Sequence, residues 1–184
     1  MTRQEALALL KENIKNQNLV KHCLAVEAVM KGLARYFSQN EEKWGLTGLL
    51  HDIDYEKTQN DPNQHSLVGA RLLEGLGIDK DICRAVKVHN EAHEDLPETL
   101  MEKALYVSDP LTGLIVAAVL VLPSKKINDL EVKSLLNRFK EKAFAKRANR
   151  GIIEKCQEYL NLNLEEFFKI SLQSMQEISE NLNL

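Results

Sequence analysis

Apolar residues recur along this chain at alternating steps of four and three, the spacing that places side chains on one face of an α-helix. The first long stretch of this kind comprises Leu19, Cys23, Val26, Met30, Leu33 and Phe37. Shorter stretches run from Ile82 to His93 and from Leu100 to Leu114, and Pro110 is expected to break or kink the second of these. No alternating run bounded by turn residues indicates a strand. The pattern predicts an all-α protein, a bundle of about eight helices.

The helical pattern continues without an internal repeat, a low-complexity tract or a linker, which predicts a single domain over residues 1–184. Hydrophobic residues make up 44% of the chain and charged residues 28%, with a net charge of −3. This balance excludes a disordered chain, and the near-neutral charge gives no overall argument for a nucleic-acid partner, so none is expected. The most apolar stretch, Leu111 to Leu122, has 12 residues. A membrane span needs roughly 20, so no membrane contact is expected.

The three cysteines lie far apart in the sequence, and none belongs to a CxxC pair. This usage indicates neither disulfides nor thiolate zinc sites. The first residues contain an acidic side chain beside a basic one and no long apolar run, unlike a secretory signal. We therefore expect a cytoplasmic protein. Its oligomeric state is open, because the amphipathic last helix could complete the core or pack on a second subunit.

All five histidines lie between His22 and His93, and each shares a helix face with apolar residues or ends an apolar run. Their side chains should therefore point into the bundle. A buried imidazole needs partners for both ring nitrogens, and several together multiply that need. A metal ion meets it for all of them at once, and facing helices assemble such sites in bundle cores. From periodicity alone, a metal centre and a set of hydrogen-bonded core histidines are both open.

Two aspartates extend this pattern. His51–Asp52 ends the apolar run GLTGLL and precedes a polar segment, so one ion could bind both side chains at a helix end. Asp109 shares a helix face with the apolar Leu105 and can point inward. A buried carboxylate without a partner is costly, and a cation is one solution. The alternative is that Asp109 and Pro110 are the N-cap and the first residue of a helix.

The ordered set His22, His51–Asp52 and Asp109 resembles the HD superfamily of metal-dependent phosphohydrolases. The resemblance implies an HD metal-binding core in residues 18–122 and leaves residues 123–184 as C-terminal helices that complete the bundle. The segment HSLVGARLLEGLGIDKDICRAVKVHN resembles the part of two-metal, HDIG-type members that supplies extra histidines, bacterial diadenosine tetraphosphate hydrolases among them. By this resemblance, His22, His51 and Asp109 hold one ion, His65 and His89 hold a second, and Asp52 bridges both.

The chain departs from the His-Asp-Ile-Gly-Lys pattern of many members, because Asp54 and Tyr55 replace the glycine and the lysine. Cyclic-dinucleotide phosphodiesterases of this type use that lysine, so its replacement argues against their substrates. Asp54 is a candidate catalytic residue beside Asp52, as a general acid or base. It could instead be a partner of a metal ligand or a solvated residue. His93 has no counterpart in the resemblance and is a candidate substrate contact, ligand partner or core residue.

Histidine and carboxylate ligands suit Mn, Fe, Zn, Co or Ni, of which one or two ions are expected. Such ions could activate a water that attacks phosphorus. We therefore predict hydrolysis of a phosphoester or phosphoanhydride in a small nucleotide-like substrate. Lys125, Lys126 and Arg138 are candidate contacts to its phosphate, although the basic segment around them could be a solvated helix face. The alternatives are a mononuclear HD nucleotidase, a non-catalytic HD module that senses a ligand or binds a protein, and a bundle without metal.

Overall fold

The computed structural model describes residues 1–93 and 95–184, and within these ranges it contains helices and no strands. Eight helices have nine or more residues: α1 (Arg3–Asn13), α2 (Gln17–Tyr36), α3 (Glu41–Leu50), α5 (Leu67–Gly75), α6 (Lys80–Val88), α7 (Leu100–Leu120), α8 (Val132–Lys140) and α11 (Leu164–Gln176). Five are shorter: α4 (Tyr55–Thr58), the 3₁₀ helix η1 (Ile127–Asp129), α9 (Arg150–Glu154), α10 (Cys156–Leu160) and α12 (Ser179–Leu182). The predicted all-α bundle of about eight helices is confirmed.

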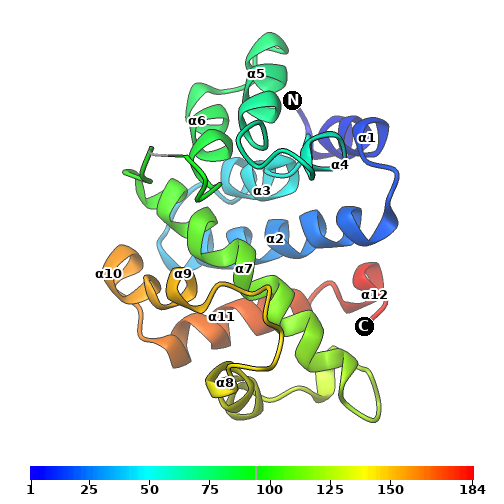
Figure 1. Cartoon of the computed structure of the whole chain (residues 1–184), viewed down its shortest axis with the longest axis vertical. Helices are drawn as coiled ribbons and strands as arrows, with labels where there is room; N and C mark the ends of the chain where they lie inside the picture. The colour runs from blue at the N-terminus through cyan, green and yellow to red at the C-terminus, as the bar shows by residue number, and fades with distance from the viewer. Residues whose placement is uncertain (94) are drawn as a thin grey trace.

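The long helix α2 lies at the centre of the bundle, with α1 and α3 to α6 on one side and α8 to α12 on the other (Figure 1). It packs against α3, α7 and α11, and α7 crosses the molecule in front of it. The contact with α3 is close because of Gly48. A Cβ at this position would lie 2.8 Å from the carbonyl oxygen of Val26, so a side chain would push the two helices apart.

Side-chain caps begin several of the helices. Asp79 accepts a hydrogen bond from the backbone N–H of Asp81 at the start of α6, and Asn163 accepts one from Glu166 at the start of α11. Gly77 has a φ of 70°, the left-handed conformation expected of the residue after a helix end. The segment LGIDKDI, residues 76–82, thus ends helix α5 and begins helix α6.

The expected break at Pro110 is wrong, and so is the alternative that Asp109 is an N-cap. The helix begins at Leu100 after the N-cap Thr99, with a capping box to Glu102, and it continues through Pro110 as one element. Asp109 is therefore an interior residue of α7 and not an N-cap. The missing hydrogen bond of a proline destabilises a helix by about 3 kcal/mol or more. Burial of Val107, Leu111 and other apolar residues before and after the proline offsets this cost.

Two apolar clusters make up the core of the described residues. The larger is built mainly by α2, α7 and α8 to α11, and the smaller mainly by α1, α3, α5 and α6 with part of α2. Thus α2 takes part in both. Polar and charged side chains of His51, Asp52, Asp54 and His89 are also buried. They come from the ends of α3 and α6, so the apolar helices position a polar site inside the protein.

Helix α7 is 21 residues long and has a window with a mean hydropathy of 1.4, so by length and composition it could cross a membrane. The apolar stretch considered in the sequence began at Leu111 and left out the first half of α7. The length of this apolar helix was therefore underestimated from the sequence. Of that window, 61% is buried inside the protein, as in the core helix of a folded domain. This one helix is weak evidence for a membrane span.

Candidate metal centre

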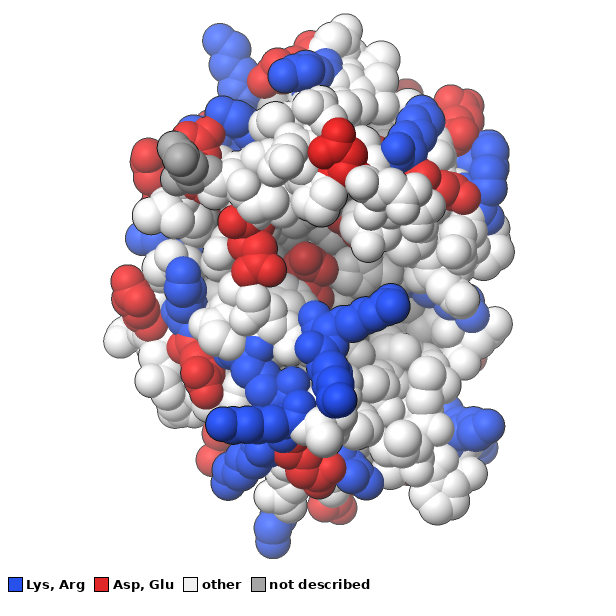
Figure 2. Space-filling model, viewed as in Figure 1, with Lys and Arg blue, Asp and Glu red and all other residues white. Residues whose placement is uncertain are grey.

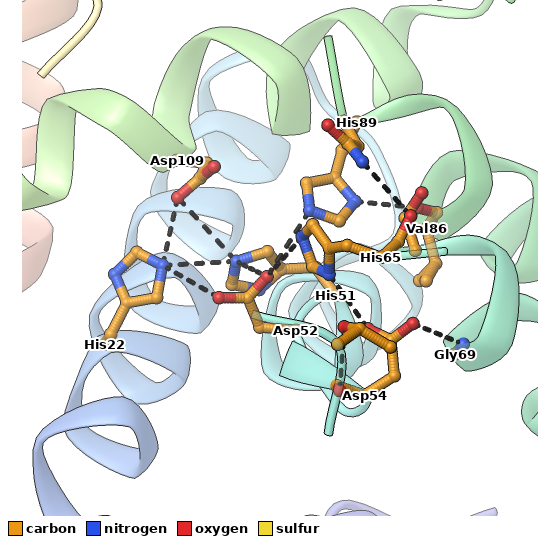
Figure 3. A network of polar contacts seen from close by, with 12 residues as sticks. His22, His51, Asp52, Asp54, His65, Gly69, Val86, His89 and Asp109 are labelled. Atoms are coloured by element: carbon orange, nitrogen blue, oxygen red, sulfur yellow. Dashed lines mark hydrogen bonds and ion pairs between the residues drawn. The ribbon is translucent and has the colours of Figure 1, made fainter. Parts of the chain in front are cut away.

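Six of the residues expected to bind metal come together in one place, although they lie on five segments of the chain (Figure 3). We call them the ligand cluster: His22, His51, Asp52, His65, His89 and Asp109. His22 lies in α2 and Asp109 in the middle of α7. His51 is the C-cap of α3 and His89 the C-cap of α6, while Asp52 follows His51 and His65 precedes α5.

The first half of the ligand cluster consists of His22, His51 and Asp109. Nε2 of His22 lies 3.0 Å from Oδ1 of Asp109 and 3.2 Å from Nε2 of His51. The Asp109 oxygen is also 3.8 Å from Nε2 of His51. One nitrogen from each imidazole and one carboxylate oxygen thus face a common point, a typical donor set for a divalent transition metal.

The second half consists of His65 and His89, which face Oδ1 of Asp52. This oxygen lies 3.3 Å from Nε2 of His65, 3.4 Å from Nε2 of His89 and 3.5 Å from Nε2 of His51. The other oxygen, Oδ2, is 3.6 Å from Nε2 of His22. Asp52 therefore turns one oxygen toward each half, the position that a bridging carboxylate needs.

Each of the four imidazoles uses Nδ1 for a hydrogen bond and leaves Nε2 facing the other ligands. The Nδ1 partners are the carbonyl of Gly48 for His51 (2.8 Å), the carbonyl of Val86 for His89 (2.6 Å), Asp54 Oδ1 for His65 (3.0 Å) and Thr112 Oγ1 for His22 (3.2 Å). The Thr112 hydroxyl donates to the carbonyl of Asp109, so it is free to accept from His22. Outer hydrogen bonds of this kind fix the tautomer and the orientation of a metal-binding imidazole.

His89 provides a test of whether these residues fit a metal. Its Nε2 is buried and makes no hydrogen bond to any described residue, although Asp52 Oδ1 lies 3.4 Å away. Leaving a buried polar atom unsatisfied costs about 1–3 kcal/mol. Nε2 of His22 and Nε2 of His51 also face each other at 3.2 Å. A cation between these nitrogens and carboxylates satisfies all of them, so the donor set fits a divalent metal.

The charges of the ligand cluster shift the pKa values of His51, Asp52, His65 and Asp109. Burial lowers the pKa of His51, but the carboxylates of Asp52 and Asp109 outweigh it and raise this pKa to about 9. Burial also opposes protonation of His65, whose pKa the carboxylates of Asp52 and Asp54 likewise raise to about 9. Burial raises the pKa values of Asp52 and Asp109, but the neighbouring histidines outweigh it and hold both well below the ordinary range. In the metal-free protein, protons take the place of a cation.

Asp54, expected as a catalytic acid or base, has a different place. Its side chain is buried, Oδ1 accepts from Nδ1 of His65 at 3.0 Å, and Oδ2 accepts from the backbone N–H of Gly69 at 2.8 Å. With both oxygens engaged, Asp54 orients His65 and does not face the cavity. A Cβ at Gly69 would lie 3.2 Å from Cγ of Asp54, so the glycine allows this approach. The alternative of a metal-ligand partner fits the geometry.

His93, expected as a substrate contact, supports the backbone of His65. The helix on which the sequence pattern placed it ends at Val88, and His93 lies in the turn that follows. Its Nε2 donates to the carbonyl of His65 at 2.9 Å and lies 3.1 Å from Oγ of Ser66. His93 is not among the residues that line the cavity beside the ligand cluster. The apolar spacing misplaced this residue because helix α6 stops one turn earlier.

A cavity of about 550 Å³ opens beside the ligand cluster. His22, His65, His89 and Asp109 line one side, and residues 145–149, from the connection between α8 and α9, line the opposite side. Figure 2 shows the hollow near the centre of this face, with acidic side chains inside it and basic side chains at its edge. We call this space the basic cavity, because Lys146 and Arg147 are among its lining residues.

The connection that carries Lys146 and Arg147 is tied down across the basic cavity. Asn149 donates from Nδ2 to Glu91 at 2.8 Å, and its Oδ1 accepts from the N–H of Ile152 as the N-cap of α9. Lys146 and Arg147 are exposed and have no hydrogen bond or ion pair to any described residue. Their charges are therefore available to a ligand in the cavity.

The three cations expected from the sequence lie elsewhere. Lys125 and Lys126 follow α7 near η1, and Arg138 in α8 forms an ion pair with Glu141 at 2.9 Å. None of the three lines the basic cavity. The sequence argument selected the correct basic segment but not Lys146 and Arg147, because helical periodicity gives no information about the irregular connection that carries them.

The fold and the ligand cluster define a helical metal-binding domain, and comparison with known families agrees. The model of the HD domain family matches residues 19–119, more than half of the chain. The chain belongs to the HD domain family. Membership supports phosphohydrolase chemistry and a divalent metal in general terms, and it leaves the substrate and the number of ions open.

Several curated proteins are similar in sequence. Ribonuclease Y of Oleidesulfovibrio alaskensis is 29% identical over 141 residues, which are 74% of this chain and 27% of that protein. Ribonuclease Y of Nitratidesulfovibrio vulgaris is 30% identical over 98 residues, 53% of this chain and 18% of that protein. An uncharacterised protein of Methanocaldococcus jannaschii is 34% identical over 130 residues, 60% of this chain and 75% of that protein. The chain thus spans a minor part of the length of the Ribonuclease Y relatives.

Proposed function

We propose that this protein is a metal-dependent phosphohydrolase that cleaves a phosphoester or phosphoanhydride bond in a small nucleotide-like substrate. The observation that carries the proposal is the convergence of four imidazole nitrogens and two carboxylates on one side of the basic cavity. A cavity of about 550 Å³ lies within the range of small-molecule sites, roughly 300–1,000 Å³. Membership in the HD domain family supports the same class of chemistry.

The proposed centre holds two ions, of Mn, Fe, Zn, Co or Ni. His22, His51 and Asp109 would hold the first and His65 and His89 the second, with Asp52 shared between them. Bound metal supplies a Lewis acid and an activated water. The alternatives are one ion at the first half, and an HD module that binds a ligand without cleaving it. The donor set of the second half, with its unsatisfied His89 Nε2, favours two ions.

The protein's own residues orient the ligands and the substrate. Asp54 holds His65 through Nδ1, so that Nε2 keeps facing Asp52. Lys146 and Arg147 would neutralise the charge of the substrate phosphate, in place of Lys125, Lys126 and Arg138. A charge-assisted hydrogen bond contributes about 1.5–3 kcal/mol. Tyr55 and Tyr106 line the basic cavity and exclude part of the bulk water.

The experiment is hydrolysis of a chromogenic phosphodiester by protein loaded with Mn²⁺. Ribonucleotide diesters are included because several relatives are named Ribonuclease Y. Replacing both cavity cations (Lys146→Ala with Arg147→Ala) should raise KM by about tenfold or more, the effect of losing one charge-assisted contact. Lys142→Ala is the matched control, since Lys142 is exposed on the same connection but does not line the cavity. Absence of hydrolysis by the unmodified protein with each of the five metals would contradict the proposal.

A further inference from the structure

A second hollow, of about 450 Å³, adjoins the basic cavity, and the two share the lining residues His22 and Gly113. Its other walls come from α2, the second half of α7 and the last residues of the chain: Asn18, Lys21, Ala25, Val116, Leu120, Leu182, Asn183 and Leu184. We call it the apolar hollow. Leu120 is 54% exposed there although it is apolar. The two spaces therefore meet at the first half of the ligand cluster.

Gly113 lies at the junction of the two spaces, one helical turn after Asp109 in the interior of α7. Glycine inside a helix is less stable than alanine, so its presence there calls for a reason. Packing supplies none, because a Cβ at Gly113 would meet no atom within 4 Å. Gly48 is the contrasting case, since a Cβ there would lie 2.8 Å from a carbonyl oxygen of α2. The space next to Gly113 is open.

We propose that Gly113 keeps a passage open for a substrate that occupies both spaces at once. The substrate class is a phosphodiester, or a diester of pyrophosphate, with a nucleoside-sized group on each side of the phosphorus. The phosphorus lies beside His22 and Asp109, and its anionic oxygens face Lys146 and Arg147. One nucleoside-sized group lies in the basic cavity, and the other lies against the apolar hollow. This inference rests on the proposed function, because it places the reacting phosphorus at the ligand cluster.

The charges and surfaces of the two spaces support such a division. The basic cavity presents Lys146 and Arg147, which suit the anionic oxygens of the phosphate. The apolar hollow presents Ala25, Val116 and Leu120, which suit the face of a base or another ring. A monoester would fill one space and leave the other empty, so it gains from one set of contacts only. Discrimination between diesters and monoesters follows from this arrangement.

The test is calorimetric titration with a dinucleoside phosphorothioate and with the matching mononucleoside phosphorothioate, each with and without Mn²⁺. The unmodified protein should bind the dinucleoside compound at least tenfold more tightly than the mononucleoside compound. Gly113→Leu should remove this preference by closing the passage, so that the two compounds bind with affinities within about twofold of each other. Gly75→Leu is the matched control, because Gly75 is also a helical glycine with no atom near its Cβ position and lies away from both spaces.

A second variant, Gly113→Ala, tests whether Gly113 keeps a passage open or has a purely structural role. Gly113→Ala should raise the melting temperature and, at the same time, weaken binding of the dinucleoside compound. Gly75→Ala should raise the melting temperature without changing binding. A structural role for Gly113 predicts the opposite, a lower melting temperature with the preference retained.

Two results would overturn the inference: equal affinity of the unmodified protein for both compounds, or an unchanged preference in Gly113→Leu. These binding measurements do not depend on turnover. Absence of hydrolysis would therefore contradict the proposed function, whereas loss of the diester preference would contradict the role of Gly113.

Discussion

The two halves of the ligand cluster are built in different ways. His22 and Asp109 lie inside the long helices α2 and α7, and His51 caps α3. In the second half, His65 lies in a turn before α5 and His89 at the end of α6. The first half depends on the packing of regular helices. The second depends on how helix ends and turns are held in place, and it therefore carries more supporting residues.

The halves also differ in exposure and in the groups that orient their histidines. The side chains of His22 and Asp109 are 24% and 32% exposed, whereas those of His65 and His89 are 12% and 2% exposed. A hydroxyl, Thr112, accepts from His22, and a buried carboxylate, Asp54, accepts from His65. His22 and Asp109 are thus more open to the basic cavity than His65 and His89, which also line it, and a carboxylate supports His65. Four experiments test whether the two halves differ in this way.

The largest effect is expected for Asp52→Asn, because Asp52 is the one carboxylate that faces both halves. Removing one partner of a buried ion pair costs about 3–5 kcal/mol. This corresponds to roughly 10²–10⁴-fold in kcat/KM or in metal affinity. Elemental analysis should show loss of metal from both halves. Asp129→Asn, at an exposed aspartate that does not line the basic cavity, is the control, and equal activity of the two variants would contradict the bridging role.

The next largest effect is expected for the loss of one histidine from either half of the ligand cluster. His22→Ala and His65→Ala should each lower the metal content by about one ion out of about two. Each should also reduce kcat/KM by more than the roughly 10–100-fold caused by loss of an outer hydrogen bond. If the unmodified protein binds one ion and His65→Ala remains fully active, the mononuclear alternative is correct and the second half shapes the pocket only.

A smaller effect is expected for the groups that orient the histidines. Asp54→Asn should weaken metal binding at the second half by about 10–100-fold, because it removes the carboxylate that holds His65. Thr112→Val removes a neutral hydrogen-bond partner of His22. Because a neutral hydrogen bond contributes about 1 kcal/mol, metal binding at the first half should weaken by less than about tenfold. Metal titrations monitored by calorimetry measure both. A larger loss in Thr112→Val than in Asp54→Asn would reverse the comparison.

The smallest effect is expected for the pH dependence of stability in the metal-free protein, where protons bind to His51 and His65. His51 and His65 have pKa values of about 9, raised from about 6.5 in the unfolded chain. Their protonation therefore stabilises the metal-free fold fully below about pH 6.5, and this contribution is lost as the pH rises through about 9. Metal binding must displace these protons, so metal affinity should increase over the same range.

NMR titration of chelator-treated protein measures the two pKa values directly. Asp54→Asn should lower the pKa of His65, because it removes a carboxylate that faces this ring alone, and should leave that of His51 nearly unchanged. Equal changes at both histidines would show that the two halves are not independently supported.

The fold and the first half of the ligand cluster could largely be predicted from the sequence. Helical periodicity placed His22 on the core side of α2, and the end of an apolar run placed His51 and Asp52 at the end of α3. Regular spacing predicts these positions because a helix has a fixed geometry. For Asp109, periodicity and the proline signal disagreed, and burial of apolar residues along α7 decided in favour of a continuous helix.

The second half of the ligand cluster and the wall of the basic cavity formed by residues 145–149 could be predicted less well from the sequence. The roles of Asp54 and His93 depend on how two turns fold back on His65, and no periodicity describes such turns. The resemblance to two-metal proteins supplied His65 and His89, whereas the apolar pattern placed His93 on the wrong element. Lys146 and Arg147 lie in an irregular connection, and only the packing of α8 and α9 brings them to the basic cavity.

The position of that cavity wall along the chain has an evolutionary consequence. The ligand cluster and the groups that orient it lie between His22 and Thr112, inside the region shared with the HD domain family. Residues 145–149 and 182–184, which line the basic cavity and the apolar hollow respectively, lie outside the matched residues. Substitutions in these residues during evolution can therefore change the shape and charge of the two spaces without altering the ligand cluster.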